Sequence, residues 1–204
     1  MGNVMDYLEW RGDLTFDQSP FNDVDNVILS QLAYVNFRDV IPSVQMNKGI
    51  TLKAAAQLFF DLHTEEELMQ DKSFIKDAPK LLKKAAQTNR FRDVILSDYV
   101  DMVDETLEKQ FGAFHIKLSP QCTYVAFRGT DDTLVGWKED FNMSFISPVP
   151  SQEDAVKYLD DTCSYIRGKL YVGGHSKGGN LAIYSAIHCS KRVRKKIQCV
   201  YNND

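Results

Sequence analysis

The residues with the clearest chemical signature are Gly174-His175-Ser176-Lys177-Gly178, which fit the pattern G-x-S-x-G. An apolar run precedes this pattern and an amphipathic stretch follows it, so Ser176 is predicted to stand on a sharp turn between a strand and a helix. A serine hydroxyl becomes a strong nucleophile only when a base removes its proton, and such a turn exposes it to both base and substrate. Gly174 and Gly178 leave room for the turn and for close approach of neighbouring backbone. The segment therefore predicts a nucleophilic serine for acyl transfer.

A glycine-rich turn that binds phosphate is the alternative for this segment, because it would also present a serine at the start of a helix. Neither G-x-G-x-x-G nor G-x-x-x-x-G-K-[ST] fits the register of these glycines. The pattern favours the nucleophile over the phosphate site.

Acyl transfer also needs hydrogen-bond donors for the negative charge that develops on the carbonyl oxygen. The helix predicted after Ser176 directs its first N–H groups at that charge, and the backbone N–H of Lys177 is the expected donor. A second donor comes from a loop after another strand. The apolar run 124–127 ends abruptly in Arg-Gly-Thr, so Thr130 could supply its backbone N–H and its hydroxyl. A hairpin end that turns on Gly129 is the alternative for this second segment.

The sequence offers no clear general base for Ser176. In proteins that carry the G-x-S-x-G turn, the catalytic acid and the histidine both follow the serine along the chain. After Ser176 the only histidine is His188, which lies roughly 18 Å along the predicted helix and is too distant. The only acid there is Asp204, a candidate catalytic acid because it follows the predicted strand 197–201. His175 is expected to pack, since its side chain should point away from that of its neighbour.

Other polar side chains are expected to be structural or solvated. His63 ends a predicted helix, and His115 lies on a predicted strand. The side chain of Lys177 should point away from the serine, which argues against a role as the base. The acidic pairs Asp131-Asp132 and Glu139-Asp140 fit no calcium-binding spacing and are expected to be solvated in loops and to form local hydrogen bonds.

The elements that must position these residues follow in a clear order. The first half is predicted to be helical, with apolar residues at helix spacing over 24–35 and a second helix from 51 to 60. The apolar Leu58-Phe59-Phe60 belongs to the core or, alternatively, to a lid. From about residue 97 the period becomes strand-like, and the runs 111–118 and 123–127 predict a hairpin.

Helices and strands then alternate to the end of the chain. A helix is expected over 152–166, a strand over 169–172, a helix over 177–189 and a strand over 197–201. Strands that alternate with helices indicate a parallel sheet, because parallel neighbours need a crossover connection. The fold class predicted for the chain is α/β.

Composition excludes several classes of protein. The 204 residues, 44% apolar and 25% charged, suit one globular domain, and the formal net charge of −4 gives no general attraction to nucleic acid. The four cysteines lack the spacing of a metal site or a disulfide framework. No signal peptide and no run of eighteen apolar residues is visible. A cytoplasmic protein without cofactor or metal is expected.

These segments together resemble a known family. The stretch 126–130, followed by Trp137, Asp140 and 174–178, is similar to the class 3 (fungal-type) lipase branch of the α/β-hydrolases. The chain resembles more closely a set of bacterial lipase-like proteins that open with the stretch seen here at 6–16.

The resemblance implies roles for individual residues and an organisation of the chain. Ser176 would be the nucleophile, and Thr130 and Lys177 would form the oxyanion hole. An α/β-hydrolase core with a mostly parallel sheet and a nucleophile elbow would occupy 97–204. A helical segment over 1–96 would pack on this core, within one structural domain.

The expected function is that of a serine hydrolase of lipase or esterase type, acting on an ester of a hydrophobic acyl group or on a lipid. Because the family runs longer and no histidine suits Ser176, the chain is expected to be the N-terminal part of a longer hydrolase and inactive by itself. The alternative is a catalytically inactive hydrolase-like module that binds a hydrophobic ligand or a protein partner.

A basic run, Lys191–Lys196, lies between the last predicted helix and strand. Positive charge at the end of a helix complements its dipole, so a solvated structural role is expected. Peripheral contact with anionic lipid head groups is the alternative.

Overall fold

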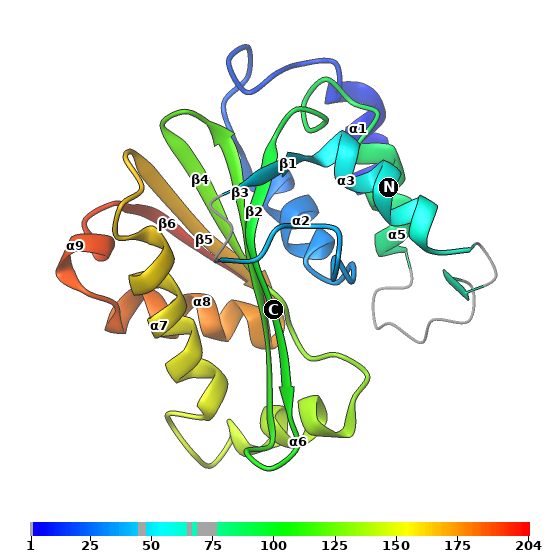
Figure 1. The fold of residues 1–204 in the computed structure, drawn as a ribbon. Coiled ribbons are helices and arrows are strands. Elements are labelled where there is room, and N and C mark those ends of the chain that lie inside the picture. The colour runs from blue at the N-terminus through cyan, green and yellow to red at the C-terminus, as the bar shows by residue number, and fades with distance from the viewer. Residues whose placement is uncertain (1, 45–47, 65–66, 69–76) are drawn as a thin grey trace.

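The computed structural model describes residues 2–44, 48–64, 67–68 and 77–204. Helices gather in the first part of the chain, and helices and strands alternate in the last part (Figure 1). The elements in chain order are α1 (Val4–Arg11), α2 (Asp23–Leu32), β1 (Gly49–Thr51), α3 (Leu52–Leu62), α5 (Ala78–Ala85), β2 (Ile95–Asp104), β3 (Lys109–Ser119), β4 (Cys122–Phe127), α6 (Leu134–Asn142), α7 (Pro150–Cys163), β5 (Lys169–His175), α8 (Lys177–His188), α9 (Lys191–Arg194) and β6 (Ile197–Asn203).

The strands of the described residues form one sheet in the order β1-β2-β3-β4-β5-β6. The neighbours from β1 to β4 pair antiparallel, whereas β5 runs parallel to β4 and to β6. The α/β class and the hairpin are confirmed, but the sheet is less parallel than expected. The length of each connection explains the difference. A tight turn at Pro120 and Gln121 joins β3 to β4 and makes them antiparallel, whereas α7 and α8 supply the longer crossovers that parallel strands need.

Two cores lie on opposite faces of the sheet. Successive residues of a strand point to opposite faces, and β4 shows this alternation. Tyr124 and Ala126 belong to the core under the N-terminal helices, whereas Val125 and Phe127 belong to the core under α7 and α8. Figure 1 shows α1, α2, α3 and α5 on one side of the sheet and α7, α8 and α9 on the other. The N-terminal helices therefore pack on the same sheet that carries Ser176 at the end of β5.

The segment expected to be helical also contributes to the sheet. β1 pairs with β2, and β2 begins at Ile95, so residue 97 lies within a strand. In β2 the register shifts between Ser97 and Val100, and Asp98 has a φ of 57°. This bulge interrupts the alternation of apolar residues, so the strand-like period from about residue 97 does not by itself define β2 as a separate strand.

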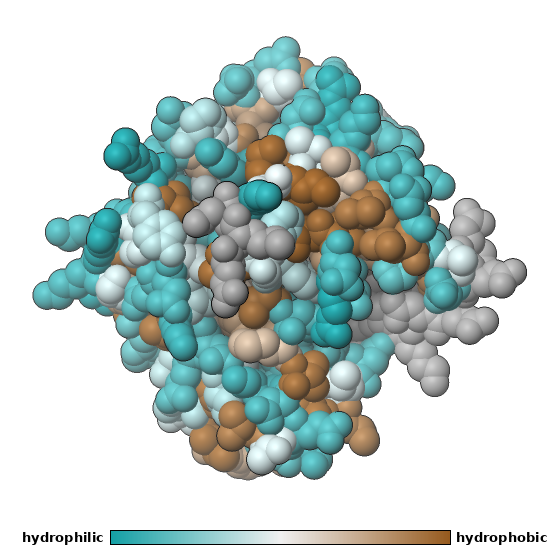
Figure 2. Space-filling view, in the orientation of Figure 1, coloured by the Kyte–Doolittle hydropathy of each residue, from teal (hydrophilic) through white to brown (hydrophobic). Residues whose placement is uncertain are grey.

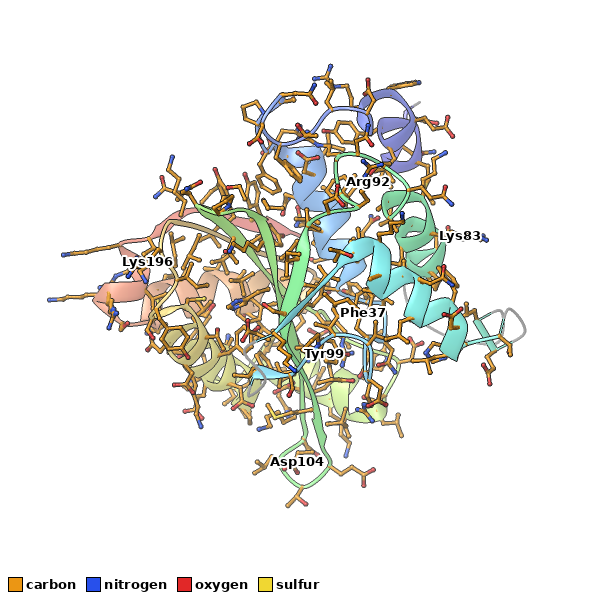
Figure 3. The ribbon with its side chains drawn as sticks, turned by 45° about the horizontal axis from the view of Figure 1, so that its top comes forward. Phe37, Lys83, Arg92, Tyr99, Asp104 and Lys196 are labelled. Atoms are coloured by element: carbon orange, nitrogen blue, oxygen red, sulfur yellow. The ribbon has the colours of Figure 1, made fainter. Side chains whose placement is uncertain are left out.

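Aromatic side chains join the N-terminal helices to the sheet. Phe37, labelled in Figure 3, packs on Phe59 of α3 and on Phe114 of β3, with ring centroids 6.3 and 5.6 Å apart. Phe59 is buried, whereas Leu58 and Phe60 are partly buried against the same core. These contacts support the core interpretation of 58–60.

A buried ion pair organises the start of the chain. Arg90 lies before β2, and its Nε donates to Asp25 of α2 at 2.6 Å, with both side chains fully buried. The same guanidinium donates to the carbonyls of Leu14 and Ser19 and stacks 4.3 Å from the ring of Phe16. One side chain thus fixes the loop between α1 and α2 against the rest of the fold.

None of the helices in the described part of the chain combines the length and apolar character that crossing a membrane would require.

Candidate active site

Ser176 occupies the turn between β5 and α8. Its backbone has φ 55° and ψ −130°, a conformation that residues other than glycine rarely adopt. Such strain persists only where the surrounding structure enforces it, and it is concentrated at functional sites. The sharp strand-to-helix turn has the form that the G-x-S-x-G pattern predicts. The side chain of Ser176 is partly exposed at this turn.

The flanking glycines are required by close backbone contacts. A Cβ on Gly174 would lie 2.6 Å from the carbonyl oxygen of Phe127, and a Cβ on Gly178 would lie 2.3 Å from the same oxygen. Because Phe127 ends β4, any larger residue at either position would push the turn away from this strand. The glycines therefore hold the turn against the loop that follows β4.

Thr130 lies in that loop, three residues after the carbonyl that both glycines approach. It is only 7% exposed, yet within the described part of the chain its hydroxyl oxygen is buried without a hydrogen-bond partner. An unpaired buried hydroxyl is costly and therefore unusual. On the other side, Lys177 begins α8, and the first N–H groups of a helix have no acceptor within it. The two residues that the sequence predicts as oxyanion donors therefore lie beside the turn of Ser176, Lys177 directly after it and Thr130 in the loop after β4.

The loop carrying Thr130 is fixed by Arg128. The Arg128 guanidinium donates to Asp101 of β2 at 2.5 Å and lies 3.7 Å from Asp131, while its backbone N–H donates to Gly112 of β3. Asp131 in turn accepts from the backbone N–H of Thr133, the N-cap residue of α6. These contacts hold the loop from 128 to 133 in one conformation.

The side chain of Lys177 has a structural role that the sequence does not reveal. Its Nζ is buried and donates to the Gln110 carbonyl, to Gln110 Oε1 and to Glu139 Oε2, at 2.7, 2.6 and 3.0 Å. Burial lowers the pKa of Lys177, and Glu139 opposes this shift. All three protons of the ammonium are engaged, so Lys177 is not placed to act as a base on Ser176.

Glu139 corrects an expectation. It was expected to be a solvated loop residue, but it lies on α6 and is only 1% exposed. Besides Lys177 it accepts hydrogen bonds from the backbone N–H groups of Gln110 and Ser151, both at 2.9 Å. A single carboxylate therefore joins α6, β3, α7 and α8 below the candidate site.

Asn203 was also not anticipated. Its backbone carbonyl accepts from the N–H of Ser176 at 3.4 Å, and its Nδ2 donates to the carbonyl of Gly174 at 3.0 Å. The side chain also exchanges hydrogen bonds with Asn26 of α2. Asp204 follows directly, so it stands at the end of the strand beside Ser176 and is exposed.

None of the four histidines forms a hydrogen bond with Ser176 in the described structure. His175 contacts Tyr34, and His115 is buried beside Asp98 and Thr162. Burial lowers the pKa of His115 to about 4, although Asp98 opposes this shift. His188 is exposed and stacks on Tyr184, as predicted too far along α8 to serve as a base.

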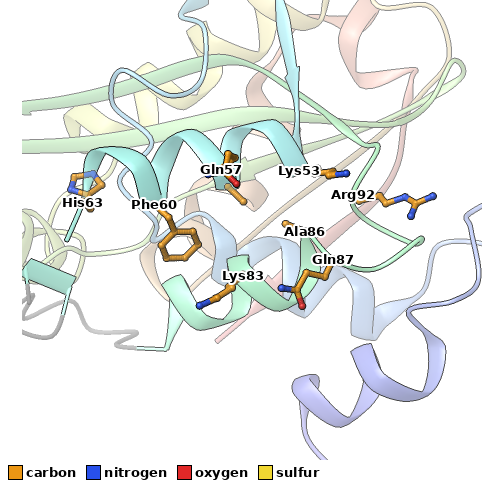
Figure 4. A pocket seen from close by; sticks show the side chains of 9 residues that line it. Lys53, Gln57, Phe60, His63, Lys83, Ala86, Gln87 and Arg92 are labelled. Carbon is orange, nitrogen blue, oxygen red and sulfur yellow. The ribbon is translucent and has the colours of Figure 1, made fainter. Parts of the chain in front are cut away.

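His63 lies at the edge of a separate groove between α3 and α5 with a volume of about 550 Å³ (Figure 4). Among the described residues, its lining includes Lys53, Lys83 and Arg92 and no carboxylate. Within the described residues, no group of three or more His, Cys, Asp and Glu side chains has an arrangement that could hold a metal ion.

α6 begins shortly after Thr130 and carries an apolar surface. Leu134, Trp137 and Phe141 of α6, and Phe145 shortly after the helix, are all at least 48% exposed. Apolar side chains gather at the lower end of Figure 2, where Figure 1 places α6. A hydrophobic surface therefore lies directly beyond the loop of Thr130.

The basic run contributes to the fold. Lys196, labelled in Figure 3, donates to the carbonyls of Cys163, Ser164 and Ile166 at 2.8 to 3.0 Å and so closes the end of α7. Arg194 donates to the carbonyl of Ile187 at the end of α8. These contacts support the structural interpretation of Lys191–Lys196.

Two comparisons with known proteins found matches. A family model described as Mbeg1-like matches residues 85–204, more than half of the chain, including Thr130 and Ser176. The structure is similar to one described as the crystal structure of M37 lipase, with 15% identity and a TM-score of 0.43. This match covers 90% of the present chain and 59% of the M37 lipase chain, so the chain spans about three fifths of that length. No curated protein matches the sequence.

Proposed function

The chain belongs to the Mbeg1-like family, and from this premise we propose that it is a serine hydrolase of lipase or esterase type that forms an acyl-enzyme on Ser176. The observation that carries the proposal is the backbone of Ser176, held at φ 55° on the turn between β5 and α8. A strained non-glycine residue at this turn, flanked by glycines in contact with β4, is the arrangement that exposes a nucleophile.

The proposed reaction is acyl transfer from an ester to Ser176 and then to water. Ser176 Oγ attacks the ester carbonyl while a base takes its proton, and the alcohol leaves with a proton as the tetrahedral intermediate collapses. The N–H groups of Thr130 and Lys177 stabilise the oxyanion. The hydroxyl of Thr130 has no partner among the described residues, which supports this role, because the developing charge would give it an acceptor.

The proposed substrate is an ester of a hydrophobic acyl group, or a lipid. The exposed apolar side chains of α6 support this class, since the helix starts only four residues after Thr130. An acyl chain that leaves the site along α6 would bury apolar surface, which is favourable by about 25 cal/mol per Å².

The proposal needs a general base for Ser176, and none of the four histidines forms a hydrogen bond with it in the described part of the chain. Asp204 is the proposed acid partner of that base, since it follows the strand beside the nucleophile turn. His175 is engaged with Tyr34 and keeps its structural role.

The second candidate function is a catalytically inactive module that binds a hydrophobic ligand or a protein partner in the same place. The positions of the four histidines favour it, because a serine without a base is a poor nucleophile. Apolar ligand binding without turnover would distinguish it from the hydrolase.

The test is covalent labelling of the protein from its natural source with a fluorophosphonate, read as intact mass, together with hydrolysis of a short aryl ester. The hydrolase proposal expects one adduct, located on Ser176, and loss of both adduct and turnover in Ser176→Ala. Ser19→Ala, a change at a partly exposed serine in the loop between α1 and α2, is the matched control and should retain both. Binding of a fatty acid by the natural protein with no adduct and no turnover would replace the hydrolase by the binding module.

A further inference from the structure

The hydroxyl of Tyr34 lies where the two halves of the candidate site meet. Tyr34 follows α2 by two residues, in the part of the chain before the family match at 85–204. Its Oη is 3.0 Å from Nδ1 of His175 and 3.3 Å from the carbonyl oxygen of His175. Because His175 immediately precedes Ser176, these contacts hold the nucleophile turn from its strand side.

The same hydroxyl touches the loop of Thr130. A Cβ on Gly129 would lie 2.0 Å from Tyr34 Oη and 2.5 Å from the carbonyl oxygen of His175. Only a glycine can occupy a position so close to both atoms. The backbone of Gly129 is therefore in close contact with both Tyr34 Oη and the His175 carbonyl oxygen.

The phenol is suited to hold both segments at once. Burial raises the pKa of Tyr34 well above its usual range, although the nearby Arg128 opposes this shift. The group is therefore neutral and keeps its proton at physiological pH. A neutral phenol can donate a hydrogen bond, here to His175, while its oxygen lies against the backbone of Gly129.

We propose that Tyr34 is a positioning residue whose hydroxyl sets the spacing between the oxyanion loop at Gly129-Thr130 and the nucleophile turn at His175-Ser176. The inference rests on the proposed hydrolase function and adds to it a residue from the N-terminal segment. The two proposed oxyanion donors, Thr130 and Lys177, come from different elements. Their separation must be fixed within a few tenths of an ångström for both to bind one oxygen, and preorganised donors are what makes such a site effective.

The test compares Tyr34→Phe with Tyr7→Phe in the natural protein. Both variants remove one phenol hydroxyl from the N-terminal segment and keep the ring. The Tyr7 hydroxyl bonds to Asp25 and Asn22, far from the candidate site, so it is a matched control. Tyr34→Phe should lower kcat for a short aryl ester about tenfold with KM changed less than twofold, and Tyr7→Phe should leave both within twofold.

A second measurement does not depend on turnover. Amide hydrogen exchange of a peptide that spans 128–131 should become about tenfold faster in Tyr34→Phe and stay unchanged in Tyr7→Phe. Unchanged exchange, or faster exchange with an unchanged kcat, would overturn the proposal. If the wild-type protein shows no turnover that depends on Ser176, the hydrolase function fails, and the exchange measurement alone decides whether Tyr34 holds the loop.

Discussion

Lys177 and Glu139 form an ion pair that is closed to solvent: Nζ lies 3.0 Å from Oε2, and the two side chains are 0% and 1% exposed. The pair links the first residue of α8, next to Ser176, with the helix that follows the loop of Thr130. The side chain of the residue after the candidate nucleophile is therefore paired with a carboxylate on α6.

Replacing Glu139 by Gln should destabilise the protein strongly. The ammonium of Lys177 would remain buried without its counter-charge, and breaking a buried pair in this way typically costs about 3–5 kcal/mol. Urea unfolding at neutral pH measures the change. Glu108→Gln is the matched control, because Glu108 pairs with Lys138 at the surface and should matter little. An equal decrease in the free energy of unfolding in the two variants would contradict the structural role of the buried pair.

The hydroxyl of Thr130 should be important for acyl transfer and unimportant for stability. Thr130→Val keeps the shape of the side chain and removes a buried oxygen that has no partner among the described residues, so the free energy of unfolding should stay equal or rise. The rate of aryl ester hydrolysis should fall about tenfold if the hydroxyl helps to stabilise the oxyanion.

Thr162→Val is the control for this change. Its hydroxyl donates to the Tyr158 carbonyl at 2.6 Å and contacts His115 at 3.0 Å, so its removal should cost about 1–3 kcal/mol of stability. A loss of stability in Thr130→Val as large as in Thr162→Val would show that the Thr130 hydroxyl is paired in solution.

Backbone strain at Ser176 should appear as a difference between two variants. Glycine tolerates a φ of 55° and alanine does not, so Ser176→Gly should be more stable than Ser176→Ala by about 1 kcal/mol. Thermal unfolding measures both, and neither variant should hydrolyse an ester. Equal stabilities would indicate that the turn relaxes in solution to an unstrained conformation.

Glycine at position 178 should be indispensable for stability. Gly178→Ala places a Cβ 2.3 Å from the Phe127 carbonyl oxygen, which forces the nucleophile turn away from β4 and should cost more than about 2 kcal/mol. Gly2→Ala is the matched control, because its Cβ would lie 3.7 Å from Trp10, at ordinary contact distance. Urea unfolding of Gly178→Ala with a midpoint equal to that of Gly2→Ala would refute the close packing.

Stability should fall in mild acid because of His115. Burial lowers the pKa of His115 to about 4 in the folded protein, below the ordinary value of about 6.5 that applies to the unfolded chain. Between these values the unfolded state binds more protons, so this stability is present above about pH 6.5 and is lost as pH falls towards 4. The total loss is on the order of 3 kcal/mol.

Unfolding free energies at pH 7 and pH 5 test this dependence. His115→Gln should flatten the part of the pH dependence that lies in this window. His188→Gln should leave it unchanged, because His188 is exposed at the end of α8. A pH dependence that survives His115→Gln would assign the acid sensitivity to another group.

Local features of this protein could be predicted from the sequence because they depend on neighbouring residues. The turn that carries Ser176 is encoded by glycines within four residues of each other, and the start of α3 by Thr51, whose hydroxyl accepts from the N–H of Ala54. The alternation from α7 to β6 is visible as changes of hydrophobic period, because each element buries one face.

Only the tertiary structure decided which distant residues support the candidate site. Glu139 and Tyr34 look like ordinary loop or helix residues in the sequence, yet they reach Lys177 and His175 from 38 and 141 positions away. β2 was not defined as a separate strand, because its bulge at Asp98 breaks the strand period. Contacts of this kind depend on how the two helical layers pack on the sheet. No periodicity or spacing within the chain specifies that packing.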